Sequence, residues 1–486
     1  MAKQAQAGAR TGQPFTGQHA VVIGGSIAGL LAGRVLADHF AQVTIIERDA
    51  LDGGATPRKG VPQGRQGHGL LNRGLNIMTD LFPDLVPDLL ASGATCLDMG
   101  TDFRWYQFGQ WKTHAQSGIM SYSQSRPLLE AKIRSRVQAL ANVRFLDQCD
   151  VTALQVNGIG SQITGVQVAQ RDGSGTTTTL PADLVVEAGG RGSRMPQWLA
   201  DLGYGRVKET AVKVDVGYAS RIYRRPANAG KDWQALMVTP KPPTETRLGL
   251  ILPIEGDRWM VSLCGWHHDY PPADEAGFLE FARSLPVPDV YNAICAAEPL
   301  EPIATHKLPS NLRRHYERLP RFPEGLAILG DALCSFNPIY GQGMSTSALD
   351  AMALDACLRQ QAAQQPAGDL TGFANRFRKG VAGVIANPWL MATGEDFRYP
   401  QTEGQRPPGT GLLHWYIGQI HALAAHDPRV LVQFLHVMNM LKPPTALFAP
   451  PIAWRVLRAQ FRRPAAPPAV ALAPPAVAGI AETGHS

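Results

Sequence analysis

The hydrophobic pattern between residues 19 and 49 predicts a strand, a helix and a second strand in succession. The first segment, HAVVIGG at 19–25, is an apolar run of the length of a buried strand. The next, SIAGLLAGRVLADHF at 26–40, has its apolar residues at helical spacing, and QVTIIERD at 42–49 is a second apolar strand that ends in acid. Because these elements follow one another within 31 residues (19–49), they form a βαβ unit, which favours a parallel sheet.

Further along the chain, one helical pattern is followed by segments in which apolar and polar residues alternate, as they do in strands. SRPLLEAKIRSRVQAL at 125–140 predicts an amphipathic helix, whereas 142–156, 163–173 and 176–190 read as a small antiparallel meander that returns to the main sheet. From about 205 to 315, alternating stretches such as VKVDVGYASRIY indicate a second, largely antiparallel sheet. We therefore expect an α/β fold, α+β overall, with a Rossmann-like parallel-sheet domain, an interleaved antiparallel domain and a C-terminal helical segment.

The same changes of pattern set the expected boundaries. A polar lead at 1–17 and a Pro/Ala-rich tail at 464–486 are expected to be disordered or extended. Between them we expect the first part of the parallel-sheet domain with its meander at 18–204, an antiparallel substrate-binding domain at 205–315, the return of the first domain at 316–380 and a helical region at 381–463.

Composition narrows the class of protein. The 486 residues are 44% hydrophobic and 18% charged, enough to bury a large core. The net charge is +6 and the cations are dispersed except near 454–463, so we expect no nucleic acid partner, whereas anionic cofactors or membrane lipids are easier to accommodate. The six cysteines lie far apart and suggest no metal site, and no run approaches 18 apolar residues. We expect a cytoplasmic protein.

The turn in VVIGGSIAGLLAG at 21–33 has the spacing of a dinucleotide fingerprint. Gly24, Ser26 and Gly29 occupy its three positions, so a serine replaces the second glycine, and its hydroxyl can itself bond a phosphate. Glu47 ends the next strand, where a carboxylate can accept both hydroxyls of an adenosine ribose; Arg48 reaches phosphate or adenine, or is a surface residue. We expect every residue of this turn to contact the dinucleotide cofactor: Gly24, Gly25, Ser26, Ile27, Ala28 and Gly29.

A second glycine loop and a third lie far downstream. DLVVEAGGRGSR at 183–194 breaks an apolar strand at two glycines, the second of which is Gly190. In GDALCSFNPIYGQGMS at 330–345, Asp331 follows Gly330, and Pro338 bends the chain before Gly341 and Gly343 open a helix. The N-terminus of this helix stabilises a negatively charged group, and an acid beside it cannot bind the same anion. We therefore expect Asp331 to accept hydrogen bonds from the hydroxyls of a polyol such as a ribityl chain.

In order and spacing, these three motifs resemble those of the FAD-dependent aromatic-hydroxylase-type monooxygenases. The resemblance covers most of residues 19–400 and implies FAD as cofactor. It implies that Arg126 contacts the FAD phosphates or ribityl region, that Asp331 contacts the ribityl and phosphate groups, and that Pro338, Gly341, Gly343 and Met344 form the flavin-side loop. Two departures stand out: Gly190 replaces the usual aspartate and Cys334 the usual histidine. Both put direct reduction by NADPH in doubt.

Within that superfamily, RKGVPQGRQGHGLL at 58–71 is similar to a loop of the flavin epoxidases of polyether-antibiotic biosynthesis. That similarity implies a place in secondary metabolism and puts Arg58 and His68 along the flavin and substrate. GEDFRYP at 394–400 matches an acid-containing stretch of the same group. His68, Tyr340 and Asp396 are thus the candidate catalytic residues, and we assign no metal ligand.

The resemblance implies that reduced FAD reacts with O2 to a C4a-hydroperoxide, which transfers one oxygen atom to an apolar substrate by epoxidation or hydroxylation. Electrons would come from NAD(P)H or from a flavin reductase. The alternatives are an FAD-dependent reductase of the geranylgeranyl type, an NAD-dependent dehydrogenase and a non-catalytic FAD- or lipid-binding module. A halogenase is less expected, because the chain lacks a GWxWxIP stretch.

Two aromatic stretches, 103–111 and 259–266, are candidate walls of the substrate pocket, through Trp105, Tyr106, Trp111 and Trp259, although aromatic residues in strands more often belong to a core. The C-terminal stretch 430–463 is apolar and then basic. It predicts either helices that pack on the FAD domain or a surface for peripheral membrane contact.

Overall fold

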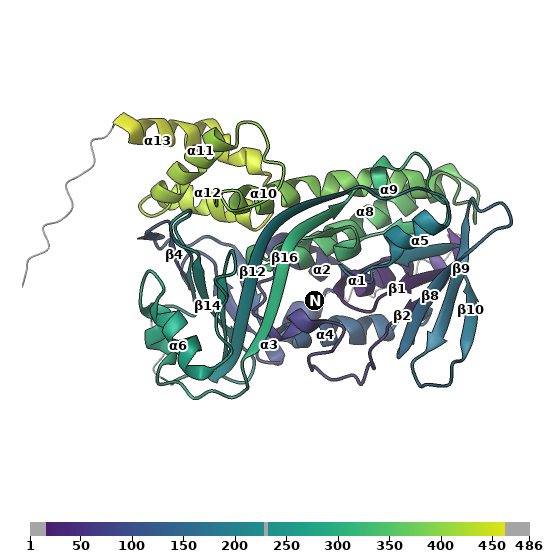
Figure 1. The fold of residues 1–486 in the computed structure, drawn as a ribbon, viewed down its shortest axis with the longest axis horizontal. Coiled ribbons are helices and arrows are strands. Elements are labelled where there is room, and N and C mark those ends of the chain that lie inside the picture. Colours follow the sequence, from purple (N-terminus) through teal and green to yellow (C-terminus); the bar gives the residue numbers. More distant parts are fainter. Residues whose placement is uncertain (1–15, 228–231, 462–486) are drawn as a thin grey trace, which may run out of the picture.

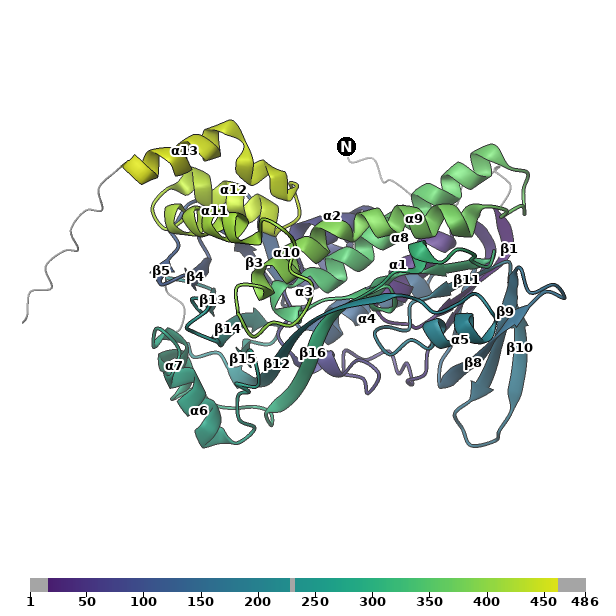
Figure 2. The same ribbon diagram turned by 45° about the horizontal axis from the view of Figure 1, so that its top comes forward.

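The computed structural model describes residues 16–227 and 232–461 (Figure 1). Nearly all of the expected polar lead and the whole of the expected Pro/Ala-rich tail lie outside the described residues. In the described part, a parallel sheet and a larger antiparallel sheet form the two halves of the molecule, with a helical segment above the second half (Figures 1 and 2).

The first half is built on a five-stranded sheet whose strand pairs are all parallel, in the order β17-β11-β1-β2-β7. Its strands are β1 (Gly17–Ile23), β2 (Phe40–Ile46), β7 (Val143–Leu146), β11 (Leu184–Glu187) and β17 (Leu326–Ile328). Helix α1 (Ile27–Leu36) connects β1 to β2, which confirms the predicted βαβ unit. The strands read as continuous apolar runs because both faces of a parallel sheet are covered.

The predicted meander forms the expected three-stranded antiparallel sheet and contacts β11. It consists of β8 (Cys149–Val156), β9 (Ile163–Gln170) and β10 (Thr177–Pro181). A further pair, β3 (Thr95–Asp98) and β6 (Met120–Ser123), is also antiparallel.

The second half is an eight-stranded sheet in the order β18-β16-β12-β15-β14-β13-β4-β5, largely antiparallel as predicted. Its strands are β4 (Phe103–Gln107), β5 (Gln110–Trp111), β12 (Glu209–Arg224), β13 (Ala235–Val238), β14 (Arg247–Ile254), β15 (Arg258–Gly265), β16 (Ala304–Arg314) and β18 (Cys334–Ser335). Three of them, β4, β5 and β18, come from outside the stretch 205–315.

Helices cover both halves. Around the parallel sheet lie α2 (Asn72–Leu81), α3 (Leu85–Ala91), α4 (Arg126–Gln138), α5 (Met195–Asp201), α8 (Gln342–Gln364) and α9 (Phe373–Val384), and α8 contacts α1, α2 and α9. Helices α6 (Glu275–Arg283) and α7 (Asp289–Ile294) pack on the second sheet. Figure 2 shows the long α8 running beside α9.

The C-terminal helices are α10 (Ala386–Asp396), α11 (Thr410–Leu423), α12 (Pro428–Met438) and α13 (Pro450–Phe461). Helices α11, α12 and α13 share a core with Trp105 of β4 and with Ile119, which directly precedes β6, so these three helices pack on the second sheet at β4. Contact with the first half is made by α10, which packs against α9, and by Asn439, which accepts hydrogen bonds from the N–H groups of Asn72 and Arg73 at α2. Among the described residues, no helix is both long and apolar enough to cross a membrane.

The turn between β1 and α1 allows no extra atom at Gly29. A Cβ built there would lie 1.8 Å from the carbonyl oxygen of Gly24, which is backbone and cannot move aside. Gly383 on α9 is also helical, but a Cβ at that position meets nothing within 4 Å.

We expect Gly29→Ala to lower the free energy of unfolding by at least about 2 kcal/mol, because the added methyl group forces α1 away from the β1 turn. The matched variant Gly383→Ala should change it by less than about 1 kcal/mol, in the stabilising direction. Urea unfolding of both variants measures the difference. Equal stability of the two would contradict the close packing of this turn.

Asp350 of α8 is a fully buried carboxyl group at the junction of the two halves. One of its oxygens accepts the Gly330 N–H at 2.9 Å, and the other has no hydrogen-bond partner in the part of the chain described. Burial raises the pKa of Asp350 to about 7, although the Gly330 N–H acts to lower it. The folded protein therefore keeps a proton here that the unfolded chain loses near the ordinary pKa of 3.8.

Because the folded pKa is raised, the contribution of Asp350 to stability is full below pH 4 and is lost as the pH rises toward 7. Asp350→Asn retains an oxygen for the Gly330 N–H but cannot ionise. We expect this variant to be more stable than the wild type at pH 8, by no more than about 4 kcal/mol, and the difference to disappear near pH 4. Thermal unfolding of both proteins between pH 4 and pH 8 tests this expectation. A difference in stability that does not change with pH would contradict it and would indicate an effect of packing alone.

Candidate active site

The glycine turn after β1 is shaped by close backbone contacts. Gly24 has a φ of +100°, and a Cβ on it would lie 2.6 Å from the carbonyl oxygen of Ala188, at the end of β11. Ser26 stands at the N-cap of α1, yet its side chain makes no capping bond. The first N–H groups of α1 are thus left without a side-chain cap, as a helix end that receives an anion requires.

The Ser26 hydroxyl takes part instead in a buried ionic cluster. It donates to Glu130 at 2.9 Å and accepts from the Arg126 guanidinium at 3.0 Å. Arg126 begins α4 and lies 2.9 Å from Glu130, one turn later on the same helix. Burial lowers the pKa of Arg126, although Glu130 acts to raise it. The structure therefore brings together Ser26 and Arg126, which are 100 residues apart.

Glu47 and Arg58 extend this cluster to the end of β2. One Glu47 oxygen accepts the Gly25 N–H at 2.8 Å and lies 3.3 Å from the Arg58 guanidinium, which also contacts Asp49 and Glu130. Burial acts to lower the pKa of Arg58, but Glu130 and Glu47 outweigh it and the pKa is raised. Arg48, by contrast, is exposed.

Asp331 faces this cluster from the late glycine loop. It lies in the short 3₁₀ turn Gly330–Ala332, where Gly330 has a φ of +63° and a Cβ on it would lie 2.8 Å from Ala28 of α1. Burial raises the pKa of Asp331 to about 6, although the charges of Arg191, Arg126 and Arg314 act to lower it. In the described residues its carboxylate accepts no hydrogen bond, so both oxygens remain for a ligand.

Open space lies beside two further glycines, and we call the site formed by the β1 turn, Glu47, Arg58, Arg126, Asp331 and these glycines the cofactor groove. A Cβ at Gly190 or at Gly343 would meet nothing within 4 Å, and Gly190 has a φ of +80°. Gly343 lies in the first turn of α8, so unpaired N–H groups border this space. A groove with uncapped helix ends, arginines and a free carboxylate fits an extended cofactor that carries both phosphates and hydroxyls. FAD has this chemistry.

Two further residues near this loop contribute to packing. Met344 packs against the core of the parallel sheet, and Cys334, at the position of the usual histidine, is buried in β18. Burial raises the pKa of the Cys334 thiol well above its usual value, so it is neutral. At the end of β11, Glu187 accepts the Gly189 N–H at 2.9 Å, and burial raises its pKa to about 7.

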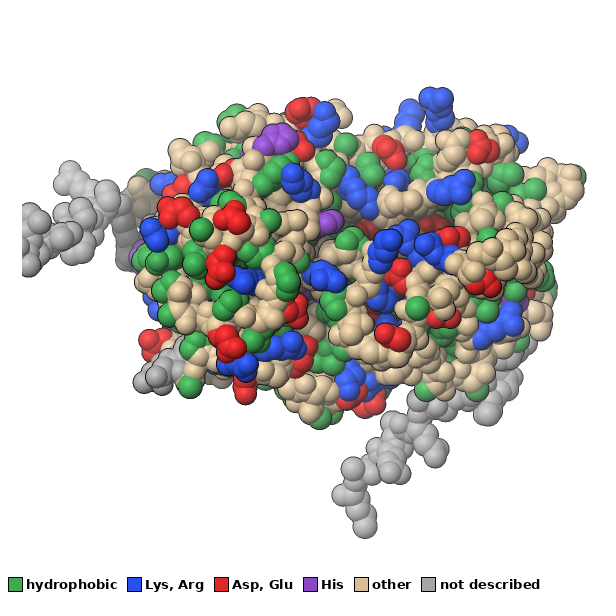
Figure 3. Space-filling view, turned by 60° about the horizontal axis from the view of Figure 1, so that its bottom comes forward, with side chains coloured by type: hydrophobic (Ala, Val, Ile, Leu, Met, Phe, Trp, Pro, Cys, Tyr) green, Lys and Arg blue, Asp and Glu red, His purple; other side chains and the backbone are tan. Residues whose placement is uncertain are grey.

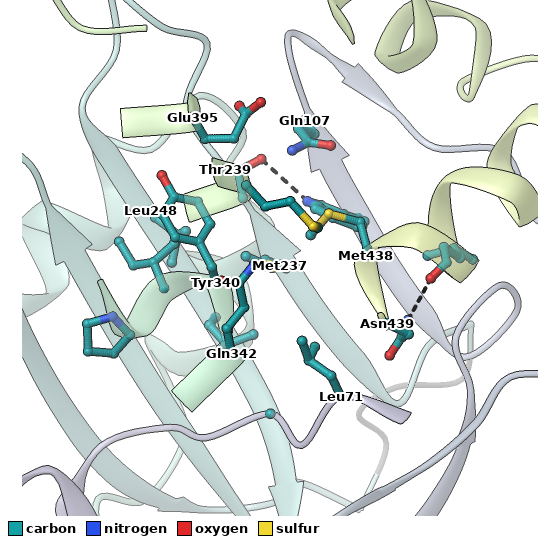
Figure 4. A pocket seen from close by; sticks show the side chains of 18 of the residues that line it. Leu71, Gln107, Met237, Thr239, Leu248, Tyr340, Gln342, Glu395, Met438 and Asn439 are labelled. Atoms are coloured by element: carbon teal, nitrogen blue, oxygen red, sulfur yellow. Dashed lines mark hydrogen bonds between the residues drawn. The ribbon is translucent and has the colours of Figure 1, made fainter. Parts of the chain in front are cut away.

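A large apolar cavity begins at the loop that follows Asp331. Its volume is about 430 Å³, and Pro338, Tyr340, Gly341 and Gln342 form part of its wall together with residues 66–71. Figure 4 shows Tyr340, Gln342, Met237 and Met438 around this space. The apolar lining comes from the large sheet and the C-terminal helices: Phe103, Trp105, Met237, Leu248, Leu250, Leu252, Ile417, Phe434, Met438 and Leu447.

The predicted aromatic walls are correct for one residue of four. Trp105 lines the cavity, whereas Tyr106, Trp111 and Trp259 pack in a separate core on the other side of the sheet. The reason is the alternation of side chains along a strand, which sends Trp105 and Tyr106 to opposite faces.

The structure joins Tyr340 and Asp396 directly. The Tyr340 hydroxyl donates to Asp396 at 2.7 Å, and the Asp396 carboxylate also accepts from Trp266, Asn311 and Asn337. Burial raises the pKa of Asp396 to about 6, although these hydrogen bonds act to lower it. Tyr340 lines the cavity but Asp396 does not, so Asp396 positions the tyrosine from behind the wall.

His68 lies on the cavity wall near a second histidine, His306 of β16. Its Nδ1 lies 2.8 Å from the Gln66 carbonyl oxygen, which can only accept, so Nδ1 carries the hydrogen and Nε2 has a free lone pair. Burial, and then the charge of Arg126, lower the pKa of His68 to about 4. The imidazole is neutral at pH 7.

The sequence patterns did not indicate several polar groups of the site. His306 and Tyr218, paired across β16 and β12, both line the cavity. The buried side-chain oxygens of Gln107 and Gln342 also border it, with no donor in the described part of the chain. Only Gln342 carried a usable signal, since it stands between the two glycines of the late loop.

The comparisons with known proteins agree with this geometry. A family model described as "FAD binding domain" matches residues 18–367. Protein Rv3254 of Mycobacterium tuberculosis is 33% identical over 469 residues, which are 93% of this chain and 95% of that protein. The solved structure of the flavin-dependent brominase Bmp2 is similar with a TM-score of 0.63 at 14% identity, over 91% of this chain and 99% of that one.

The p-nitrophenol 4-monooxygenase PnpA from Pseudomonas putida DLL-E4 gives a TM-score of 0.63 at 15% identity, over 88% of this chain and 99% of that one. At such identities the two solved structures establish the fold alone. The family match covers well over half of the chain, including the glycine turn and the Asp331 loop. The chain therefore belongs to the FAD-binding domain family, with the fold of the aromatic-hydroxylase-type flavoenzymes and with FAD as its cofactor.

Proposed function

We propose that this protein is an FAD-dependent monooxygenase that inserts one atom of O2 into an apolar organic substrate. One observation carries the proposal: the apolar cavity shares residues 338–342 with the loop that holds Asp331. A substrate in the cavity would thus lie against the flavin end of the groove. When bound and reduced, FAD supplies the electrons that convert O2 into one oxygen atom on the product and one water molecule.

The residues of the groove divide the work of binding. We assign the uncapped N-terminus of α1, with Arg126, to the phosphates, and Asp331 to the ribityl hydroxyls. Glu47 would accept the adenosine ribose hydroxyls, and Arg58 would neutralise Glu47 and Glu130 beneath them. This assignment gives hydrogen-bond donors to the buried Asp331 carboxyl group, which has none within the described residues.

The cavity excludes water and orients the substrate. Apolar side chains from two sheets and the C-terminal helices leave few places for water to bond, so that water competes little with an apolar substrate there. The free oxygens of Gln107 and Gln342 would accept hydrogen bonds from donor groups on the substrate.

His68 and Tyr340, the two candidate catalytic residues on the cavity wall, favour epoxidation of an alkene over hydroxylation of a phenol. With a pKa of about 4, His68 is too weak a base to hold a phenolic proton at neutral pH. Burial raises the pKa of Tyr340 well above its usual value, so its hydroxyl stays protonated and donates to Asp396. Transfer of oxygen to an alkene requires no base.

We infer that the electrons come from NAD(P)H, either directly or through a separate flavin reductase. The replacement of the usual aspartate by Gly190 favours the second route. Anaerobic mixing of the FAD-loaded protein with NADPH, with and without a flavin reductase, distinguishes the two by the loss of flavin absorbance.

The reaction itself is tested with FAD-loaded protein, a reducing system and a panel of apolar alkenes and aromatic compounds. We expect oxygen uptake and a product 16 mass units heavier than its substrate. A reductase of the geranylgeranyl type would instead give a product two units heavier without oxygen uptake, which would overturn the proposal in favour of that alternative.

We expect Asp331→Ala to weaken FAD binding by about 10- to 150-fold, because a charged acceptor of hydroxyl hydrogen bonds is lost. The matched control is Asp80→Ala, which removes an exposed aspartate of α2. Flavin fluorescence during titration of the protein freed of FAD gives both dissociation constants. Unchanged affinity in Asp331→Ala would show that Asp331 does not contact the cofactor.

A further inference from the structure

Helix α13 has two apolar faces, and only one of them is packed. Ile452 and Val456 are buried in the core formed with α11 and α12. Trp454, Leu457 and Phe461 follow one another at helical spacing on the opposite face, where Trp454 is 66% and Phe461 87% exposed. A helix that is apolar on both faces needs a second apolar environment.

Neighbouring elements extend this face into a surface. Helix α11 and the 3₁₀ turn Pro444–Phe448 both contact α13, and Gln460 of α13 donates to Gln419 of α11 at 2.8 Å. We call the exposed apolar side chains of these three elements the C-terminal apolar surface: Leu412, Trp415, Phe448, Trp454, Leu457 and Phe461. Figure 1 shows α11 and α13 at the outer edge of the molecule.

The substrate cavity reaches this surface. Phe448 lines the cavity and is also 46% exposed, and its ring stacks on Tyr416 of α11 at a centroid distance of 4.5 Å. Leu413 and Ile417 of α11 line the cavity as well. Phe448 therefore belongs both to the cavity wall and to the C-terminal apolar surface.

The charged residues of the C-terminal helical region are mostly positive. Between residues 407 and 463 the sequence has a single acid, Asp427, whose carboxylate is already paired with Arg455. Against it stand six cations: Arg429, Lys442, Arg455, Arg458, Arg462 and Arg463. On the face shown in Figure 3, by contrast, positive and negative side chains are interspersed.

We propose that the C-terminal apolar surface docks on a lipid bilayer that contains anionic lipids. Exposed tryptophans suit the interfacial layer of a membrane, and the cations complement anionic headgroups. A second copy of this chain fits less well, because a twofold contact would bring cations against cations without acids to pair them. If the proposed function holds, an apolar substrate passes from the bilayer past Phe448 into the cavity.

The test uses the full-length FAD-loaded protein and sedimentation with vesicles of phosphatidylcholine, with or without phosphatidylglycerol. The key variant is the triple substitution Trp454→Ser, Leu457→Ser and Phe461→Ser, which leaves the cavity lining intact. Its control is Ile159→Ser, because Ile159 is 86% exposed but lies in the turn between β8 and β9. Flavin absorbance reports that each variant remains folded and loaded.

We expect the wild type and Ile159→Ser to bind vesicles that contain phosphatidylglycerol, and the triple variant to bind them at least about tenfold more weakly. Arg458→Gln should weaken binding about fivefold on anionic vesicles and not on neutral ones. No binding by the wild type, or equal binding by the triple variant, would overturn the proposal. The proposal would also be overturned if the wild type did not bind vesicles but formed a dimer, and the triple variant were a monomer.

Vesicle binding needs no turnover, so this experiment separates the two proposals. A protein that oxidises alkenes in solution but ignores vesicles contradicts the docking proposal alone. A protein that binds vesicles through α13 but consumes no oxygen contradicts the monooxygenase proposal alone.

Discussion

Residues 326–345 tie the two halves of the molecule together, and the rest of the site depends on this constraint. Strand β17 bonds β11 in the parallel sheet, and six residues after its end β18 begins to bond β16 in the antiparallel sheet. With so short a connection, Asp331 has to lie where the two sheets meet. The chain that follows then has to form the cavity wall at Tyr340 before α8 begins.

Burial of charge at this junction has a cost that the folded protein tolerates. Burial raises the pKa values of Asp331, Asp350 and Glu187 together, which means that each destabilises the fold when ionised. Arg126 and Arg191 offset part of that cost for Asp331. Groups that are charged, buried and incompletely paired are typical of binding sites, because a ligand completes their hydrogen bonds. The ribityl and phosphate groups of FAD would do so here.

Local pattern predicted much of this fold. Apolar runs and glycine positions were sufficient for β1, α1 and β2, and the order of three motifs indicated a common cofactor for Gly24 and Asp331. Contacts between distant segments were beyond reach: the sequence does not show that Ser26 meets Arg126, or that Trp266 supports Asp396. Alternation along β4 predicts that Trp105 and Tyr106 face opposite sides. It does not tell which side holds the cavity, because both sides are apolar.

The central claim is that the cavity and the flavin end of the groove adjoin. Titration of the oxidised FAD-loaded protein with an apolar alkene, followed by difference absorbance of the flavin, tests it most directly. We predict a saturable change in the flavin spectrum that Leu250→Trp, a substitution that fills the cavity, abolishes without loss of FAD. The claim would be contradicted by an alkene that binds the wild type in equilibrium dialysis, does not bind Leu250→Trp, and yet leaves the flavin spectrum of the wild type unchanged.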